Sequence, residues 1–212
     1  MEDAADLGAL ALLADPVRRA AYEAVAGSAA PVGRDDVAAR LGVGRTLAAF
    51  HLDKLVDAGL LEVSYARRSG RSGPGAGRPA KLYRRAPGER AVSVPPRSYR
   101  SAAELLAEAV ERSGADATLY DVARQHGKGA GIAGDVLAAL TDRGYQPEVD
   151  GATVRLRNCP FHRLAEEFPP LVCGMNLALL AGLTEGSGWQ ARLDPAPGRC
   201  CVVVSKNNSD HL

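Results

Sequence analysis

The chain has 212 residues, of which 46% are hydrophobic and 24% charged, and its formal net charge at pH 7 is +1. This length allows one large or two modest domains, and this composition excludes wholesale disorder. The longest apolar runs are too short to span a bilayer, and the acidic first residues lack the features of a secretion signal. We therefore expect a cytoplasmic globular protein with no membrane partner, in which thiols stay reduced.

Helices are predicted for most of the first 58 residues. Residues 7–26 form two short helices separated at Asp15-Pro16, because Asp caps helix N-termini and Pro suits the first helical position. A short helix near 34–41 and another near 45–58 follow, and a tight turn, "GVG", joins them.

The helix near 45–58 has the spacing of a helix with one buried face. Ala48, Leu52 and Leu55 recur at helical spacing, and Gly59 lies just past the last turn, where helices commonly stop. Two short helices joined by a tight turn are typical of a helix-turn-helix, in which the second helix can enter the major groove of DNA.

Two strands are predicted next, in "LLEVSYARR" and "AKLYRRA", because β-branched and aromatic residues alternate with polar ones. The loop between them is rich in Gly, Ser and Arg. Between residues 63 and 88 there are seven basic residues and no acidic one, which is either a solvated loop or a surface for phosphate contact. A two-stranded ribbon directly behind a recognition helix is a wing.

The segments "DPVRR", "RTLAAFHLDKLVDAGLL" and "GRPAKLYR" resemble the winged-helix bacterial regulators of the arsenic-repressor (ArsR-like) superfamily, over about residues 8–86. The resemblance implies a DNA-binding domain, and the alternative is a winged helix used for protein contacts. Gly44 departs from the family, in which Ser or Thr often caps the recognition helix, although glycine still caps tolerably.

The outer face of the recognition helix and the wing carry the candidate DNA contacts. Arg45 is suited to guanine, and Ala49 or Phe50 to a thymine methyl. His51 either contacts phosphate or packs within the domain, whereas Lys54 and the wing residues are expected on phosphates. The full set is Arg45, Thr46, Ala49, Phe50, His51, Lys54, Arg67, Arg68, Arg71, Arg78 and Lys81.

The middle of the chain predicts a linker and three helices. Residues 87–100 hold several prolines and no helical rhythm, so we expect a linker there. An amphipathic helix over 101–114 follows, opened by a capping box of Ser101 and Glu104. Its apolar stripe is either ordinary core or a dimer seam, and the symmetry of repressors that read two half-sites favours a homodimer. The stripe consists of Leu105, Leu106, Ala109 and Val110.

Helices near 117–127 and 131–143 are followed by a hairpin that turns at Asp150-Gly151. The hairpin leads to Cys159, and all four cysteines of the chain lie in its last quarter.

The cysteines are Cys159, Cys173, Cys200 and Cys201, and no pair has the spacing of a zinc knuckle. Cys173 is expected near a helix N-terminus, which favours a thiolate. Cys200 and Cys201 are expected on a strand, where adjacent side chains point to opposite faces, so that one of them faces a shared site. Thiols from separated segments can hold an iron–sulfur cluster. The alternative is that each is a small buried residue.

The whole chain also resembles the regulators grouped with the SUF-operon repressor (SufR-like), through "NCPF", "LVC", "L..GL" and a late cysteine. The resemblance implies a homodimeric repressor that holds an iron–sulfur cluster, with 4Fe–4S favoured over 2Fe–2S. Carried over by residue, the ligands are Cys159, Cys173 and one of Cys200 and Cys201, with Cys200 favoured. The fourth ligand stays open among the neighbouring cysteine, His162, a non-protein thiol and a residue of a partner subunit.

We therefore expect an α+β chain with a winged helix-turn-helix domain (1–86), a linker (87–100) and a dimerisation and sensor domain (101–212). The expected function is regulation of transcription at a double-stranded DNA operator with an inverted repeat, controlled by redox, iron or nitric oxide status. The alternative is a regulator that senses a metal ion, thiol oxidation or a small molecule. No catalytic arrangement stands out, so we expect no enzyme.

Overall fold

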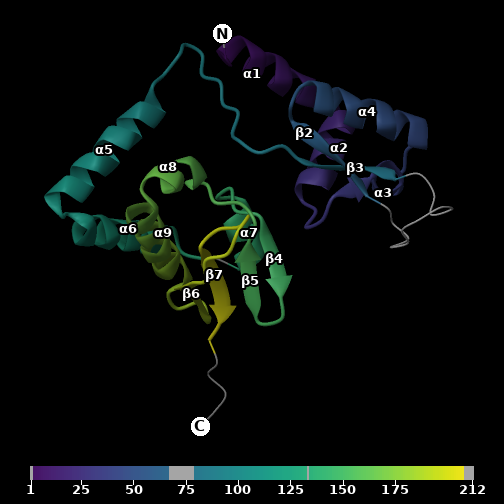
Figure 1. Cartoon of the computed structure of the whole chain (residues 1–212). Coiled ribbons are helices and arrows are strands. Elements are labelled where there is room, and N and C mark those ends of the chain that lie inside the picture. Colours follow the sequence, from purple (N-terminus) through teal and green to yellow (C-terminus); the bar gives the residue numbers. More distant parts are fainter. Residues whose placement is uncertain (1, 67–78, 133, 208–212) are drawn as a thin grey trace. The chain divides into compact units, whose positions relative to one another are not determined.

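The computed structural model describes residues 2–66, 79–132 and 134–207. The chain divides into two compact units, Met1–Arg97 and Ser98–Leu212. Each unit combines helices with a small antiparallel sheet (Figure 1), so the chain is a mixed α+β protein, as predicted. None of the helices in the described ranges is long and apolar enough to cross a membrane.

The first unit begins with helix α1 (Glu2–Ala11), a 3-10 turn (Leu12–Ala14) and helix α2 (Pro16–Ala26). The Asp15 side chain accepts a hydrogen bond of 2.9 Å from the backbone N–H of Arg18, and proline follows at the first helical position. The predicted break between two helices is therefore confirmed, although the first helix begins earlier than residue 7.

Helices α3 (Arg34–Leu41) and α4 (Arg45–Asp57) follow, joined by residues 42–44. Gly42 ends α3 with φ +65°, in the left-handed region where a side chain would be strained. Ala48, Leu52 and Leu55 are fully buried, as their helical spacing predicted. They fix which face of α4 turns inward and which stays outward.

The sheet of the first unit has the order β1-β3-β2, with β1 (Val32–Gly33), β2 (Leu61–Ala66) and β3 (Ala80–Arg85). Both strands predicted behind α4 are thus confirmed, and they pair antiparallel from Leu61 opposite Arg85. The loop between them, residues 67–78, lies outside the described residues. The buried Tyr83 on β3 donates a hydrogen bond of 2.9 Å to the Asp53 carboxylate on α4, which ties the sheet to that helix.

Most of the segment predicted as a linker belongs to the first unit, which extends to Arg97. Arg90 forms an ion pair of 2.5 Å with Asp6 on α1 and also donates to the carbonyl of Gly59 at 3.4 Å. These contacts hold the middle of the segment against its own unit.

The helices of the second unit are α5 (Tyr99–Ser113), α6 (Asp116–Ala130), α7 (Val136–Thr141), α8 (His162–Glu167) and α9 (Pro169–Thr184). The predicted capping box is wrong, because α5 starts at Tyr99 and so places Ser101 within its first turn. Glu104 instead pairs with Arg100 at 2.6 Å, one turn before it.

The sheet of the second unit has the order β4-β5-β7-β6, with β4 (Pro147–Asp150), β5 (Thr153–Leu156), β6 (Trp189–Leu193) and β7 (Val202–Lys206). All its pairs are antiparallel. The predicted hairpin is confirmed, and Gly151 turns it with φ +60°.

Helices α6 and α9 lie side by side (Figure 1) and approach each other at two glycines. A Cβ atom built on Gly127 would lie 2.1 Å from the carbonyl oxygen of Leu179, and one built on Gly182 would lie 2.1 Å from that of Arg124. The two backbones are therefore in direct contact, and this contact fixes the position of α9, which also packs on β6 and β7.

Candidate functional site

Three separate segments of the second unit carry its four free thiols. Cys159 follows β5 after two residues, in a turn that is closed by a 3.1 Å hydrogen bond from the N–H of His162 to the carbonyl of Cys159. Cys173 is the fifth residue of α9, one turn further into the helix than predicted. Cys200 and Cys201 lie just before β7.

The strand predicted for Cys200 and Cys201 begins only at Val202, so that prediction is wrong. The N–H of Cys200 donates to the carbonyl of Leu156 at 2.8 Å, and the carbonyl of Cys201 accepts from Asp194 at 2.8 Å. Because neither residue is within the regular strand, strand alternation does not decide which thiol faces the others.

The structure brings both late cysteines to the earlier ones, in two pairs. The thiol of Cys200 donates a hydrogen bond to Cys159, which lowers the pKa of Cys159; the same bond and burial raise the pKa of Cys200. Burial and a hydrogen bond with Cys173 raise the pKa of Cys201 to about 12. Each late cysteine therefore contacts a different earlier one: Cys200 contacts Cys159, and Cys201 contacts Cys173.

A buried polar pair lies behind Cys200. The side-chain N–H of Asn176 donates to the Cys200 sulfur at 3.3 Å, and the Asn176 oxygen accepts from the Tyr145 hydroxyl at 2.5 Å. Burial raises the pKa of Tyr145, so its hydroxyl stays protonated and acts as a donor. Sequence reasoning missed both residues. The available signal was a single Asn within "LVCGMNLALLAGL", because a polar side chain on a buried helix needs a partner.

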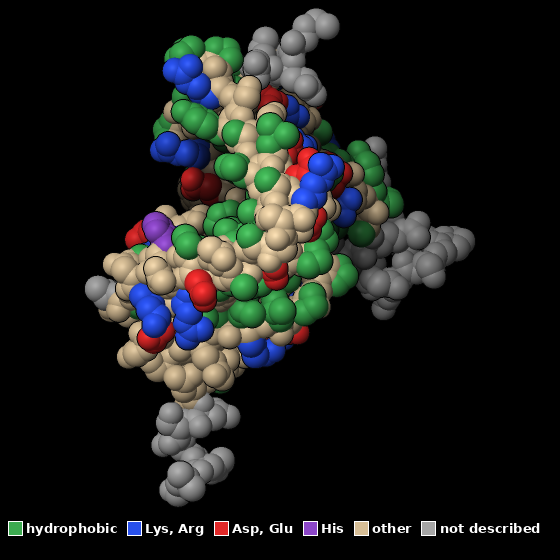
Figure 2. Space-filling view, turned by 90° about the vertical axis from the view of Figure 1, so that its left-hand side faces the viewer, with side chains coloured by type: hydrophobic (Ala, Val, Ile, Leu, Met, Phe, Trp, Pro, Cys, Tyr) green, Lys and Arg blue, Asp and Glu red, His purple; other side chains and the backbone are tan. Residues whose placement is uncertain are grey.

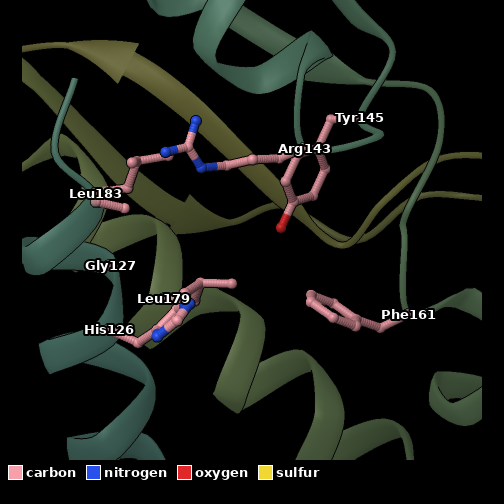
Figure 3. A pocket seen from close by; sticks show the side chains of 8 residues that line it. His126, Gly127, Arg143, Tyr145, Phe161, Leu179 and Leu183 are labelled. Carbon is pink, nitrogen blue, oxygen red and sulfur yellow. The ribbon is translucent and has the colours of Figure 1, made fainter. Parts of the chain in front are cut away.

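Tyr145 also lines a cavity of about 170 Å³, which is drawn in Figure 3. The side chains of Tyr145, Phe161 and Leu179 point toward the space between them (Figure 3). Arg143 lies at the same cavity and donates to the carbonyl of Ala139 at 2.7 Å. The cavity is therefore lined by a residue that is linked through Asn176 to the sulfur of Cys200.

The donor set suits soft metals. Thiolates are the ligands that iron–sulfur clusters require, and here they come from a turn, a helix and a strand entry. Within the described ranges, no three His, Cys, Asp or Glu side chains are close enough to hold one metal ion.

His162 is not part of this group. Its side chain is 65% exposed and lies 3.4 Å from Glu166, one turn along α8. Of the two candidates within the chain for a fourth ligand, the neighbouring cysteine contacts another thiol, whereas His162 pairs with Glu166.

Comparison with protein-family models, curated proteins and solved structures finds no match.

The outer face of α4 carries most of the candidate DNA contacts that the structure describes. Thr46, Phe50 and Lys54 are exposed, and Ala49 is half-buried beside them. Arg45 is exposed and forms an ion pair of 2.8 Å with Asp35 on α3. The face of α4 opposite its buried stripe therefore exposes both polar and apolar side chains.

The wing candidates are only partly described. Lys81 on β3 pairs with Asp53 on α4 at 2.6 Å, and both side chains remain more than a third exposed. Arg67, Arg68, Arg71 and Arg78 lie outside the described residues.

His51 is buried, with 5% of its surface exposed, and its ring stands edge-on to that of Phe50. A side chain this enclosed does not reach a phosphate, so the structure supports the packing alternative for His51 and not the DNA contact.

Proposed function

We propose that this chain is a cytoplasmic regulator of transcription that binds double-stranded DNA with its first unit and holds an iron–sulfur cluster in its second. The observation that carries the proposal is that four thiols from three separated segments lie in two contacting pairs, with a buried amide that donates to one sulfur. Thiols that merely filled core space would need no such donor.

The DNA-binding part rests on the order of elements in the first unit. Helix α2, strand β1, helices α3 and α4 and the β2–β3 pair follow one another as in a winged helix, in which α4 would be the recognition helix. Its outer face carries Arg45 and Thr46 at the N-terminal end, which is the part of a recognition helix that contacts base edges.

In the second unit, Cys159, Cys173 and Cys200 would be cluster ligands, and Cys201 is the nearest candidate for the fourth position. A bound cluster supplies one-electron chemistry and is sensitive to oxidants, to nitric oxide and to iron supply. The residues of the chain would hold the thiolates and keep water from Cys200, which is buried.

A homodimer would place two recognition helices on an inverted repeat, about 34 Å apart. Helix α5 supports this part of the proposal, because Leu105 and Leu106 are 67% and 68% exposed. Figure 2 looks onto the side of the molecule where α5 and α6 lie, and hydrophobic side chains are spread over this face.

The cluster is tested by iron and sulfide analysis of protein purified without oxygen, with Cys159→Ala, Cys173→Ala, Cys200→Ala and Cys201→Ala as single variants. We expect a brown wild type, loss of iron in the first three variants and a smaller loss in Cys201→Ala. His162→Ala is the matched control and should keep its iron. Iron-free wild type would contradict the proposal.

The DNA-binding part is tested by titrating specific and random DNA at several salt concentrations. Arg45→Ala should relax the preference for the specific sequence, whereas Arg71→Ala should weaken binding to both DNAs and reduce the dependence on salt. Equal losses on both DNAs for both variants would reverse this assignment.

The two thiol pairs favour one alternative, a regulator that senses thiol oxidation. In that case a peroxide would take two electrons and two protons from a pair such as Cys159 and Cys200. The pair becomes a disulfide, while hydrogen peroxide becomes two water molecules or an alkyl peroxide becomes an alcohol and one water molecule. Colourless, iron-free protein with peroxide-dependent DNA binding would select this alternative.

A further inference from the structure

Asn176 is the most enclosed polar side chain near the thiols. It lies on α9, one turn after Cys173, and only 1% of its surface is exposed. Its side chain forms two hydrogen bonds, one to the sulfur of Cys200 and one from the hydroxyl of Tyr145. A buried amide is costly unless both of its ends are paired, so this arrangement links three residues into one unit.

The partners of Asn176 decide which way its amide faces when the sulfur carries no proton. A thiolate can only accept a hydrogen bond, so the N–H group must face Cys200. The oxygen then faces Tyr145, which has a hydrogen to donate and is kept protonated by burial. Each end of the Asn176 amide then has a partner, which makes the group suited to a metal-bound Cys200.

We propose that Asn176, held by Tyr145, is a positioning residue that orients the Cys200 sulfur and raises the reduction potential of the cluster held there. The inference rests on the proposed function and goes beyond it, because it assigns the control of the potential to a residue that is not a ligand. It also distinguishes the two late cysteines, since Asn176 donates to Cys200.

The direction of the effect follows from charge. Reduction adds negative charge to a cluster and its thiolates, and an N–H group aimed at a sulfur stabilises that charge. The stabilisation is greater in a buried site than in water, because the surroundings screen it less. Removal of the donor therefore makes reduction harder.

The first test measures the reduction midpoint of full-length protein loaded with iron under anaerobic conditions. Asn176→Leu removes the donor at similar volume and should shift the midpoint to a more negative potential. Tyr145→Phe keeps the donor but loses its anchor, so we expect a smaller shift in the same direction. Thr184→Val is the matched control, because Thr184 is a buried polar residue on the same helix whose hydroxyl donates to the carbonyls of Leu180 and Ala181.

An unchanged midpoint in Asn176→Leu with normal iron content would overturn the inference. If Asn176→Leu does not fold, an unchanged midpoint in Tyr145→Phe would overturn it instead. An equal shift in Thr184→Val would show that the effect comes from a general disturbance of α9, which also overturns it.

The second test needs no iron. In reduced, iron-free full-length protein, the side-chain amide signals of Asn176 in a ¹⁵N–¹H NMR spectrum should exchange slowly with solvent. They should move more in Cys200→Ala than in Cys201→Ala. If they do not move in Cys200→Ala, the contact with the sulfur is absent and the inference fails. Absence of iron in the wild type would defeat the proposed function and with it the effect on the potential, whereas this spectrum would decide separately whether Asn176 positions the Cys200 sulfur.

Discussion

Cys159 is the thiol whose surroundings favour ionisation. It accepts a hydrogen bond from Cys200, and this contact lowers the pKa of Cys159. Cys200 donates this hydrogen bond and is buried, and both effects raise the pKa of Cys200. Burial and the contact with Cys173 raise the pKa of Cys201 to about 12. The hydrogen bond between the two sulfurs therefore favours ionisation of Cys159 over ionisation of Cys200.

We expect Cys159 to react with iodoacetamide faster than Cys200 and Cys201 at pH 7 in reduced, iron-free protein. Only the thiolate is the nucleophile, and a lowered pKa gives more thiolate at a given pH. Mass spectrometry of peptides after timed alkylation measures the order. Equal rates for Cys159 and Cys201 would show that the hydrogen bond does not favour the Cys159 thiolate.

Asp53 joins the outer face of α4 to the sheet. Burial opposes its ionisation, but hydrogen bonds from Lys81 and Tyr83 outweigh burial and lower the pKa of Asp53 below its ordinary 3.8. A lowered pKa means that the ionised group stabilises the folded state above that value, and that the stabilisation is lost as the pH falls through the lower, folded value.

Asp53→Asn should therefore lower the free energy of unfolding of the first unit by about 1 kcal/mol at pH 7, since it loses one partly exposed ion pair and weakens one hydrogen bond. The difference from wild type should shrink as the pH falls well below 4. Urea unfolding at pH 7 and pH 3 measures both values, and a difference that grows at pH 3 would contradict the assignment.

The contact between α6 and α9 is the tightest between two elements of the second unit. Gly127 and Gly182 let the two backbones touch, and α9 carries both Cys173 and Asn176. The distance between these helices thus sets where one thiol and the donor to another thiol lie.

Gly182→Ala should destabilise the second unit by about 1–3 kcal/mol, because the new methyl group would lie 2.1 Å from a backbone oxygen that has no flexible side chain to move. Gly129→Ala on α6 is the matched control, since its Cβ meets nothing within 4 Å. The control should gain up to about 1 kcal/mol from helix propensity. Urea unfolding compares the two, and equal stabilities would contradict the close approach.

Local patterns predicted the elements well where the signal lies within a few residues. The buried stripe of α4, the break at Asp15 and the hairpin at Gly151 all follow from spacing or from one turn residue. The capping box at Ser101 failed because the helix already begins at Tyr99, two residues earlier, which propensity alone did not indicate.

The candidate site was predictable in its members but not in its geometry. The clustering of four cysteines late in the chain indicated them as a group. The role of both late thiols depends on β7 starting at Val202, one residue after Cys201, which sequence periodicity does not determine. The contacts of Asn176 join residues 31 positions apart, so only tertiary packing brings them together.

The proposed homodimer rests on the exposed leucines of α5, Leu105 and Leu106. Leu105→Glu combined with Leu106→Glu should turn a dimer into a monomer, because two charges would be buried without partners in an apolar seam. Analytical ultracentrifugation measures the mass. Val149→Glu is the matched control, since Val149 is 60% exposed on β4, away from α5. A double variant that stays dimeric would place the seam elsewhere.

The three cysteine-bearing segments also have a thermodynamic consequence. A group bonded to the turn after β5, to α9 and to the entry of β7 would cross-link parts of the chain that are 14 to 42 residues apart in sequence. Its binding free energy would be added to the folding free energy of Ser98–Leu212 and not to that of Met1–Arg97. Loss of this group to an oxidant would therefore lower the melting temperature of Ser98–Leu212 and leave that of Met1–Arg97 unchanged.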